Sequence, residues 1–123
     1  MGNPFVHVEL NTTDVAKAKT FYGQLFDWKM EDVPMGPGYD YTTISPGEGT
    51  GGGITNKAPG ADPSAWIAYV LVDDVAATVK KAKSLGASIK KDTTEIPDIG
   101  TFAIITDPTG AALAFWKPKP KAS

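Results

Sequence analysis

Residues 5–25, FVHVELNTTDVAKAKTFYGQL, and residues 66–85, WIAYVLVDDVAATVKKAKSL, follow one pattern, and this pattern decides the fold. Each segment opens with an apolar-rich run of period-two character, which is typical of a β-strand. Cap-type residues follow, Thr12, Thr13 and Asp14 in the first segment and Asp73 or Asp74 in the second, and they predict the start of a helix. The triplet Asp-Val-Ala occurs at positions 14–16 and again at 74–76, so the chain contains an internal repeat.

The rest of each repeat also corresponds. An apolar stripe at helical spacing follows each cap, at Val15, Ala18, Tyr22 and Leu25 and then at Val75, Val79, Ala82 and Leu85. Three more strands are predicted after each helix, over 28–33, 39–45 and 52–56 and then over 88–95, 101–106 and 111–117. Each half therefore has the order βαβββ. We predict one domain over residues 1–123, with modules at about 3–56 and 65–117 joined by a Pro/Gly-containing linker at 57–64.

Composition excludes several classes of protein. The chain has no cysteine, which excludes disulfides and thiolate metal sites. All 12 basic residues are lysine and the net charge is −2, so the arginine contacts typical of nucleic-acid recognition are absent. No apolar stretch approaches the roughly 20 residues that cross a bilayer, and the first residues do not resemble a signal peptide. We therefore expect a cytoplasmic protein that binds neither nucleic acid nor membrane.

The glycine-rich run at residues 47–52 satisfies the dinucleotide-binding pattern G-x-G-x-x-G. That pattern has its usual meaning only where it follows a strand and opens a helix. Here a predicted strand follows the glycines, so we interpret the run as a turn.

The order of the elements, the length and the Asp-Pro-x-Gly turn at 107–110 resemble the vicinal oxygen chelate superfamily, which includes glyoxalases, extradiol dioxygenases and bleomycin-resistance proteins. The resemblance extends from Asn3 to about Trp116. It implies an α+β fold in which two βαβββ modules form an eight-stranded curled sheet around a cleft. It also implies a homodimer, and unpaired sheet edges give a physical reason for pairing.

Enzymes of this superfamily hold a divalent metal with ligands from the first and last strands of each module. The resemblance places these ligand positions at His7, about Gly53, Ile67 and Ala114, and only the first can bind a metal through its side chain. Whether Trp66 or Ile67 faces the cleft depends on the register of that strand, which the sequence leaves open. Catalytic zinc usually has three protein ligands, so we predict neither a metal site nor another cofactor.

Two residues are candidates for catalysis without a metal. His7 and Glu9 are two apart on a strand and therefore share a face. A carboxylate beside an imidazole can orient it as a general base. Aromatic and small residues on predicted strands are candidates for contact with a flat, moderately apolar ligand: Tyr41, Gly53, Tyr69, Phe102, Ala114 and Trp116.

Three functional classes remain. The prediction we adopt is a small-molecule-binding protein like those of bleomycin resistance, without a catalytic metal. The alternative is a glyoxalase-like lyase or isomerase, or a dioxygenase, in which His7 is a metal ligand or a general base. A structural or regulatory partner domain is the third class. The sequence does not decide whether the protein is an enzyme.

Overall fold

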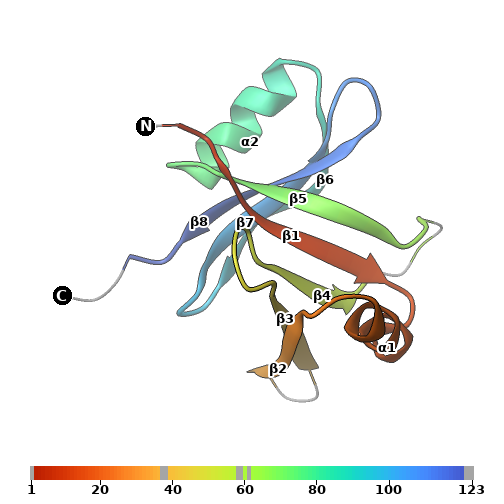
Figure 1. The fold of residues 1–123 in the computed structure, drawn as a ribbon. Helices are drawn as coiled ribbons and strands as arrows, with labels where there is room; N and C mark the ends of the chain where they lie inside the picture. Colours follow the sequence, from red (N-terminus) through yellow and green to blue (C-terminus); the bar gives the residue numbers. More distant parts are fainter. Residues whose placement is uncertain (1, 37–38, 58–59, 61, 121–123) are drawn as a thin grey trace. The chain divides into compact units, whose positions relative to one another are not determined.

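The computed structural model describes residues 2–36, 39–57, 60 and 62–120, and it contains the two predicted βαβββ modules (Figure 1). The first module consists of β1 (Phe5–Thr12), α1 (Val15–Leu25), β2 (Lys29–Gly36), β3 (Tyr39–Ser45) and β4 (Gly52–Asn56). The second consists of β5 (Ala65–Leu71), α2 (Val75–Ser84), β6 (Ser88–Ile96), β7 (Gly100–Thr106) and β8 (Ala112–Pro118). The predicted α+β fold class is confirmed. The predicted linker lies partly outside the described residues.

The two modules have equivalent strand arrangements. The chain divides into two compact units, Val6–Ile67 and the remaining described residues, and we describe each by itself. The strand order is β2-β3-β4-β1 in the first module and β5-β8-β7-β6 in the second. In both modules the first strand pairs in parallel with the last, while the other pairs are antiparallel. The internal repeat in the sequence is therefore a repeat of topology.

Both helices begin at the aspartates that the sequence repeat aligned. The Asp14 carboxylate accepts a hydrogen bond from the Lys17 backbone N–H at 3.0 Å, and Asp74 accepts one from Ala77 at the same distance. Each bond satisfies a donor that the first helical turn leaves without a partner. Of the two candidates for the second cap, Asp74 is thus the N-cap residue.

The glycine-rich run is a loop, as interpreted from the sequence. Residues 46–51 connect β3 to β4 and form neither a helix nor a strand. Gly47 and Gly49 have φ values of +99° and +79°, which side-chain-bearing residues rarely adopt. Gly47 and Gly49 are therefore explained by the backbone of the turn.

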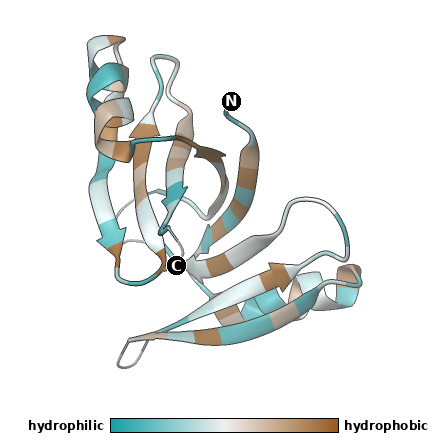
Figure 2. Cartoon of the chain, turned by 90° about the vertical axis from the view of Figure 1, so that its left-hand side faces the viewer, coloured by the Kyte–Doolittle hydropathy of each residue, from teal (hydrophilic) through white to brown (hydrophobic). Residues whose placement is uncertain are grey.

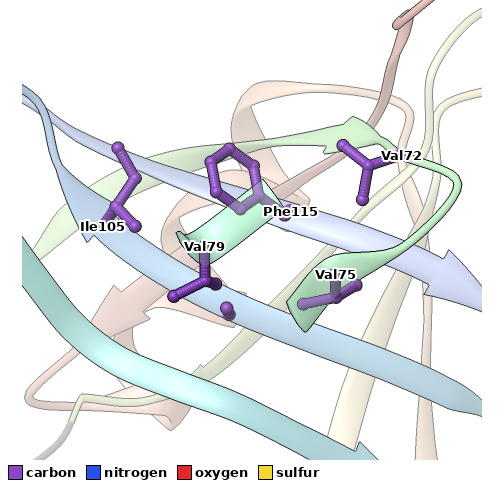
Figure 3. Packing of buried hydrophobic residues seen from close by; sticks show 6 residues of the cluster. Val72, Val75, Val79, Ile105 and Phe115 are labelled. Atoms are coloured by element: carbon purple, nitrogen blue, oxygen red, sulfur yellow. The ribbon is translucent and has the colours of Figure 1, made fainter. Parts of the chain in front are cut away.

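The second module has the larger core. Six buried residues pack between α2 and its sheet, five of which are labelled in Figure 3: Val72, Val75, Val79, Ala103, Ile105 and Phe115. Both Val75 and Val79 belong to the predicted helical stripe, and Ala82 packs at the edge of this core. Leu85, by contrast, is 68% exposed, because the helix ends at Ser84 and the chain turns away.

The first module has a smaller core beneath α1. Three buried residues form it, Leu10, Ile44 and Ile54. Val15, Ala18 and Tyr22 of the predicted stripe pack against them but are only partly buried. Leu25 is 55% exposed, so its predicted place in the core was wrong.

Figure 2 shows hydrophobic and hydrophilic bands along the strands, and successive side chains of a strand point to alternate faces of the sheet. This alternation directs one set of side chains toward the helix of each module and the other set toward the opposite face. Within the described residues, neither helix is long and apolar enough to cross a membrane. The opposite face, which the helix does not cover, is the place to look for a functional site.

We predict that replacing Phe115 with alanine destabilises the protein by about 3–5 kcal/mol, because it opens a cavity in the core beneath α2. Leu85→Ala is the matched control, since the exposed Leu85 side chain contributes little, and we expect a change within about 0.5 kcal/mol. Urea denaturation monitored by circular dichroism measures both values. Equal destabilisation by the two variants would contradict the described core.

Candidate functional site

The first module carries a row of polar side chains on the face of its sheet opposite α1. Leu10 of β1 points toward α1 and belongs to the core there. Because side chains alternate along a strand, His7, Glu9 and Asn11 point to the opposite face. Glu9 is only 8% exposed, and a buried carboxylate is stable only when hydrogen bonds satisfy it.

Hydrogen bonds join these residues to Tyr41 of β3. The Tyr41 hydroxyl donates to Glu9 Oε1 at 2.8 Å, and its oxygen lies 2.7 Å from His7 Nε2. Asn11 Nδ2 donates to Glu9 Oε2 at 3.2 Å, so both oxygens of the carboxylate accept a hydrogen bond. His7, Tyr41 and Glu9 therefore form one continuous chain of hydrogen bonds, which we call the His–Tyr–Glu chain.

Gly53 allows Tyr41 to reach His7 and Glu9. The strand order places β4 between β3 and β1, so the Tyr41 side chain must extend across β4. Its ring and hydroxyl lie over Gly53, where an added Cβ would overlap with both. Adjacent strands are about 4.8 Å apart, and only a glycine leaves this path open to a side chain that crosses a whole strand. Tyr41 and Gly53 thus form a steric pair.

Burial affects the protonation of His7. Desolvation of the half-buried ring lowers the pKa of His7 from its ordinary value of 6.5, and the Glu9 carboxylate opposes this change by favouring the charged form. The larger effect is the desolvation. The folded protein therefore favours a neutral imidazole, which can accept a proton.

The residues present do not fit the divalent metal that the superfamily implies. His7 Nε2 is hydrogen-bonded to Tyr41, and the space above Gly53 is filled by the tyrosine ring. Nowhere in the part of the chain that the structure describes do three His, Cys, Asp or Glu side chains group closely enough to hold a metal ion. Histidine and one carboxylate from a single strand leave most of a coordination sphere unfilled.

The remaining predicted ligand contacts come together in the second module. Tyr69 of β5 pairs in register with Ala114 of β8, and Phe102 of β7 pairs with Trp116. Phe115, between Ala114 and Trp116, belongs to the core beneath α2, so its two neighbours face away from that helix. A Cβ at Gly100 would lie 2.6 Å from the Trp116 ring, so here too a glycine makes room for an aromatic side chain.

The structure settles the register that the sequence left open. Trp66 lies on the α1 side, where its ring contacts Tyr22 and Trp28. Ile67 is buried and, by alternation, shares a face with Tyr69. Ile67 is therefore the residue on the face opposite the helix.

Sequence reasoning missed two features. The first is Asn11, which has the same strand parity as His7 and Glu9 and could have been found by extending that argument by two residues. The second is a surface on α1, the segment after it and the start of β5, formed by partly or largely exposed aromatic rings in mutual contact: Phe21, Tyr22, Phe26, Trp28 and Trp66. We call these five residues the aromatic surface.

A groove of about 250 Å³ opens beside the aromatic surface. It is lined by Val8, Trp28, Ile44, Pro46, Thr50, Gly51, Gly52 and Trp66. The groove lies wholly within the first module, and most of its lining is apolar. It is separate in the sheet from the His–Tyr–Glu chain, since Ile44 faces α1 and Tyr41 faces away.

Comparison with known proteins shows relatives in sequence and in fold. A Mycobacterium tuberculosis protein described as "Putative glyoxylase CFP32" is 41% identical over 116 residues, covering 89% of this chain and 44% of the relative. The anthracycline biosynthesis protein DnrV of Streptomyces peucetius is 28% identical, covering 89% of this chain and 45% of the relative. The chain thus spans less than half the length of these curated relatives.

Solved structures share the fold at low sequence identity. A hypothetical protein, BH1468, from Bacillus halodurans superposes with a TM-score of 0.67 at 18% identity, covering 100% of this chain and 99% of the other. Methylmalonyl-CoA epimerase from Mycobacterium tuberculosis superposes with a TM-score of 0.65 at 14% identity, covering 94% of this chain and 88% of the other. The sequence profile of the Glyoxalase/Bleomycin resistance protein/Dioxygenase superfamily matches residues 5–115. With nearly the whole length matched, the chain belongs to the Glyoxalase/Bleomycin resistance protein/Dioxygenase superfamily.

Proposed function

We propose that this chain binds a small molecule and that the His–Tyr–Glu chain supplies the polar contacts to it. The observation that carries the proposal is the buried Glu9 carboxylate, hydrogen-bonded through Tyr41 to His7 on the sheet face opposite α1. Apolar residues of similar volume would stabilise such a buried position as well or better. A polar chain held there by a glycine is therefore better explained by binding than by stability.

Proton transfer to or from the bound molecule is the second candidate function. The lowered pKa of His7 favours this role, because a neutral imidazole is the form that accepts a proton. The relatives named as a glyoxylase and as a biosynthesis protein support small-molecule chemistry in general. A metal-dependent lyase or dioxygenase receives less support, because the residues at the implied ligand positions do not fit a metal.

We further propose that the chain forms a homodimer and that the aromatic surface is where two copies meet. Phe21, Phe26 and Trp66 are 58%, 45% and 38% exposed, and with the 55% exposed Leu25 they leave several large apolar side chains open in one compact unit. Protruding rings and a groove lie on the same face of one module. A twofold interface uses the same patch on both copies, so a face that carries both rings and a groove can be complementary to itself.

We expect fragments that bind this protein in ligand-detected NMR to bind roughly tenfold or more weakly to Glu9→Gln, because a hydrogen bond to a charged group contributes about 1.5–3 kcal/mol. A library of flat, moderately apolar molecules is the suitable probe. Leu85→Ala, at an exposed position in the other unit, is the control that keeps wild-type affinities. Fragments that bind Glu9→Gln as tightly as Leu85→Ala would show that the binding site does not include Glu9.

Native mass spectrometry tests the metal question on protein purified without chelator, before and after addition of nickel, zinc, manganese or iron(II). We expect no divalent ion to be retained, because among the described residues no three His, Cys, Asp or Glu side chains group closely enough to hold one. One metal ion per chain that disappears in His7→Ala would overturn the proposal of a metal-free site.

Acidification is expected to destabilise the wild-type protein more than His7→Gln, because the pKa of His7 is lowered by folding. As the pH falls below about 6.5, His7 takes up a proton in the unfolded chain before it does so in the folded chain. The contribution of His7 to the free energy of unfolding is therefore complete above the unfolded pKa and is lost as pH falls below it. Urea denaturation at about pH 7.5 and about pH 5.5 measures the difference. An equal loss of unfolding free energy in both proteins would show that burial does not lower the pKa of His7.

Phe21→Glu is expected to weaken self-association roughly tenfold or more, because a charge replaces the most exposed ring of the aromatic surface. Sedimentation velocity over a range of concentrations gives the dissociation constant. Leu85→Glu introduces the same charge at an exposed site in the other unit and should leave association unchanged. A wild-type protein that stays monomeric at every concentration would refute the dimer.

A further inference from the structure

The position of Tyr41 between a carboxylate and an imidazole constrains where its hydrogen lies. A phenolic hydroxyl has one hydrogen to donate, and a carboxylate oxygen can only accept. The hydroxyl therefore donates to Glu9 Oε1, at 2.8 Å, and cannot also donate to His7. Its oxygen, 2.7 Å from His7 Nε2, can only accept there, so Nε2 must carry a hydrogen.

We infer that Tyr41 is a positioning residue that fixes the His7 imidazole as the Nε2–H tautomer. A neutral imidazole carries one hydrogen, so with Nε2 protonated the nitrogen that can accept a hydrogen or a proton is Nδ1. The Glu9 carboxylate sets the donor-to-acceptor direction of every hydrogen bond in the His–Tyr–Glu chain. It orients the Tyr41 hydroxyl, and the hydroxyl orients His7. Asn11, which donates to the other Glu9 oxygen, holds that end in place.

Gly53 is the steric condition for this arrangement. Without it Tyr41 could not lie across β4, and the hydroxyl would be displaced from between Glu9 and His7. Gly53 pairs with Glu9 in the parallel ladder between β1 and β4, so any side chain at position 53 would stand beside the carboxylate in the path of the tyrosine. The tautomer of His7 therefore depends on a residue that has no side chain.

The inference deepens the proposed function and rests on it for the class of ligand. With Nδ1 as the accepting nitrogen, His7 suits a ligand that presents a hydrogen donor to it, such as a hydroxyl, an amide N–H or an acidic C–H. A group that only accepts hydrogen bonds has no hydrogen to offer Nδ1, so this tautomer matches donors better than acceptors at that nitrogen.

Long-range ¹H–¹⁵N NMR of the histidine ring tests the tautomer directly, because the chain contains a single histidine and its signals need no assignment among others. We expect the ligand-free wild-type protein, about two pH units above the ordinary histidine pKa, to show one tautomer with hydrogen on Nε2 and a ring N–H signal protected from exchange. A hydrogen on Nδ1, or equal populations of both forms, would overturn the inference.

Tyr41→Phe keeps the ring over Gly53 and removes only the hydroxyl. The protected Nε2–H signal should be lost, and the ¹⁵N shifts should move toward the average of two tautomers. Tyr22→Phe removes a hydroxyl from the α1 side of the same module and should leave the His7 signals unchanged. A Tyr41→Phe spectrum identical to that of the wild type would show that Tyr41 does not position His7.

Gly53→Ala is the second variant, since an added Cβ should displace the Tyr41 hydroxyl and produce the same loss of signal. Circular dichroism confirms that each variant is folded before its spectrum is interpreted. A folded Gly53→Ala protein that keeps the protected signal would refute the steric condition. All of these spectra are recorded without ligand, so failure of the tautomer inference and failure of small-molecule binding are observed in separate experiments.

Discussion

The absence of a side chain at Gly53 is the constraint on which the polar site of the first module depends. It lets one tyrosine cross a whole strand, and the Tyr41 hydroxyl then joins His7 to Glu9. A buried carboxylate without such partners would be strongly destabilising. The glycine therefore determines both the geometry of the site and whether Glu9 can be buried at all.

The two modules share a topology but differ in what they place opposite their helices. The first presents histidine, tyrosine, glutamate and asparagine, while the second presents a buried alanine and tyrosine beside Phe102 and Trp116. Their cores differ in the same way, since six buried residues lie beneath α2 and three beneath α1. The repeat has thus kept its hydrogen-bonded framework while its side chains took on separate roles.

The fold could be predicted because its signals are local and repeated. Period-two strands, two aspartate caps and turn residues are each read within a few positions, and the ends of each predicted strand lie within about three residues of the observed ones. His7 and Glu9 were placed on one face by parity alone. The role of Tyr41 could not be predicted, because it depends on β4 lying between β3 and β1 and on a glycine 12 residues further along the chain. Leu25 was misplaced for a similar reason, since helical spacing does not reveal how closely a helix approaches its sheet.

The shallow packing of α1 has a consequence for the dynamics of the molecule. All eleven of its residues are described and none is fully buried, whereas α2 buries Val75 and Val79. Segments with few buried apolar contacts open at lower free energy than the rest of a protein, and their amide hydrogens exchange sooner. The first helix is thus expected to open at lower free energy than α2. A partner that covers the exposed rings of α1 would slow this opening. The amide hydrogens of the whole helix would then exchange more slowly, although the partner touches only one face of it.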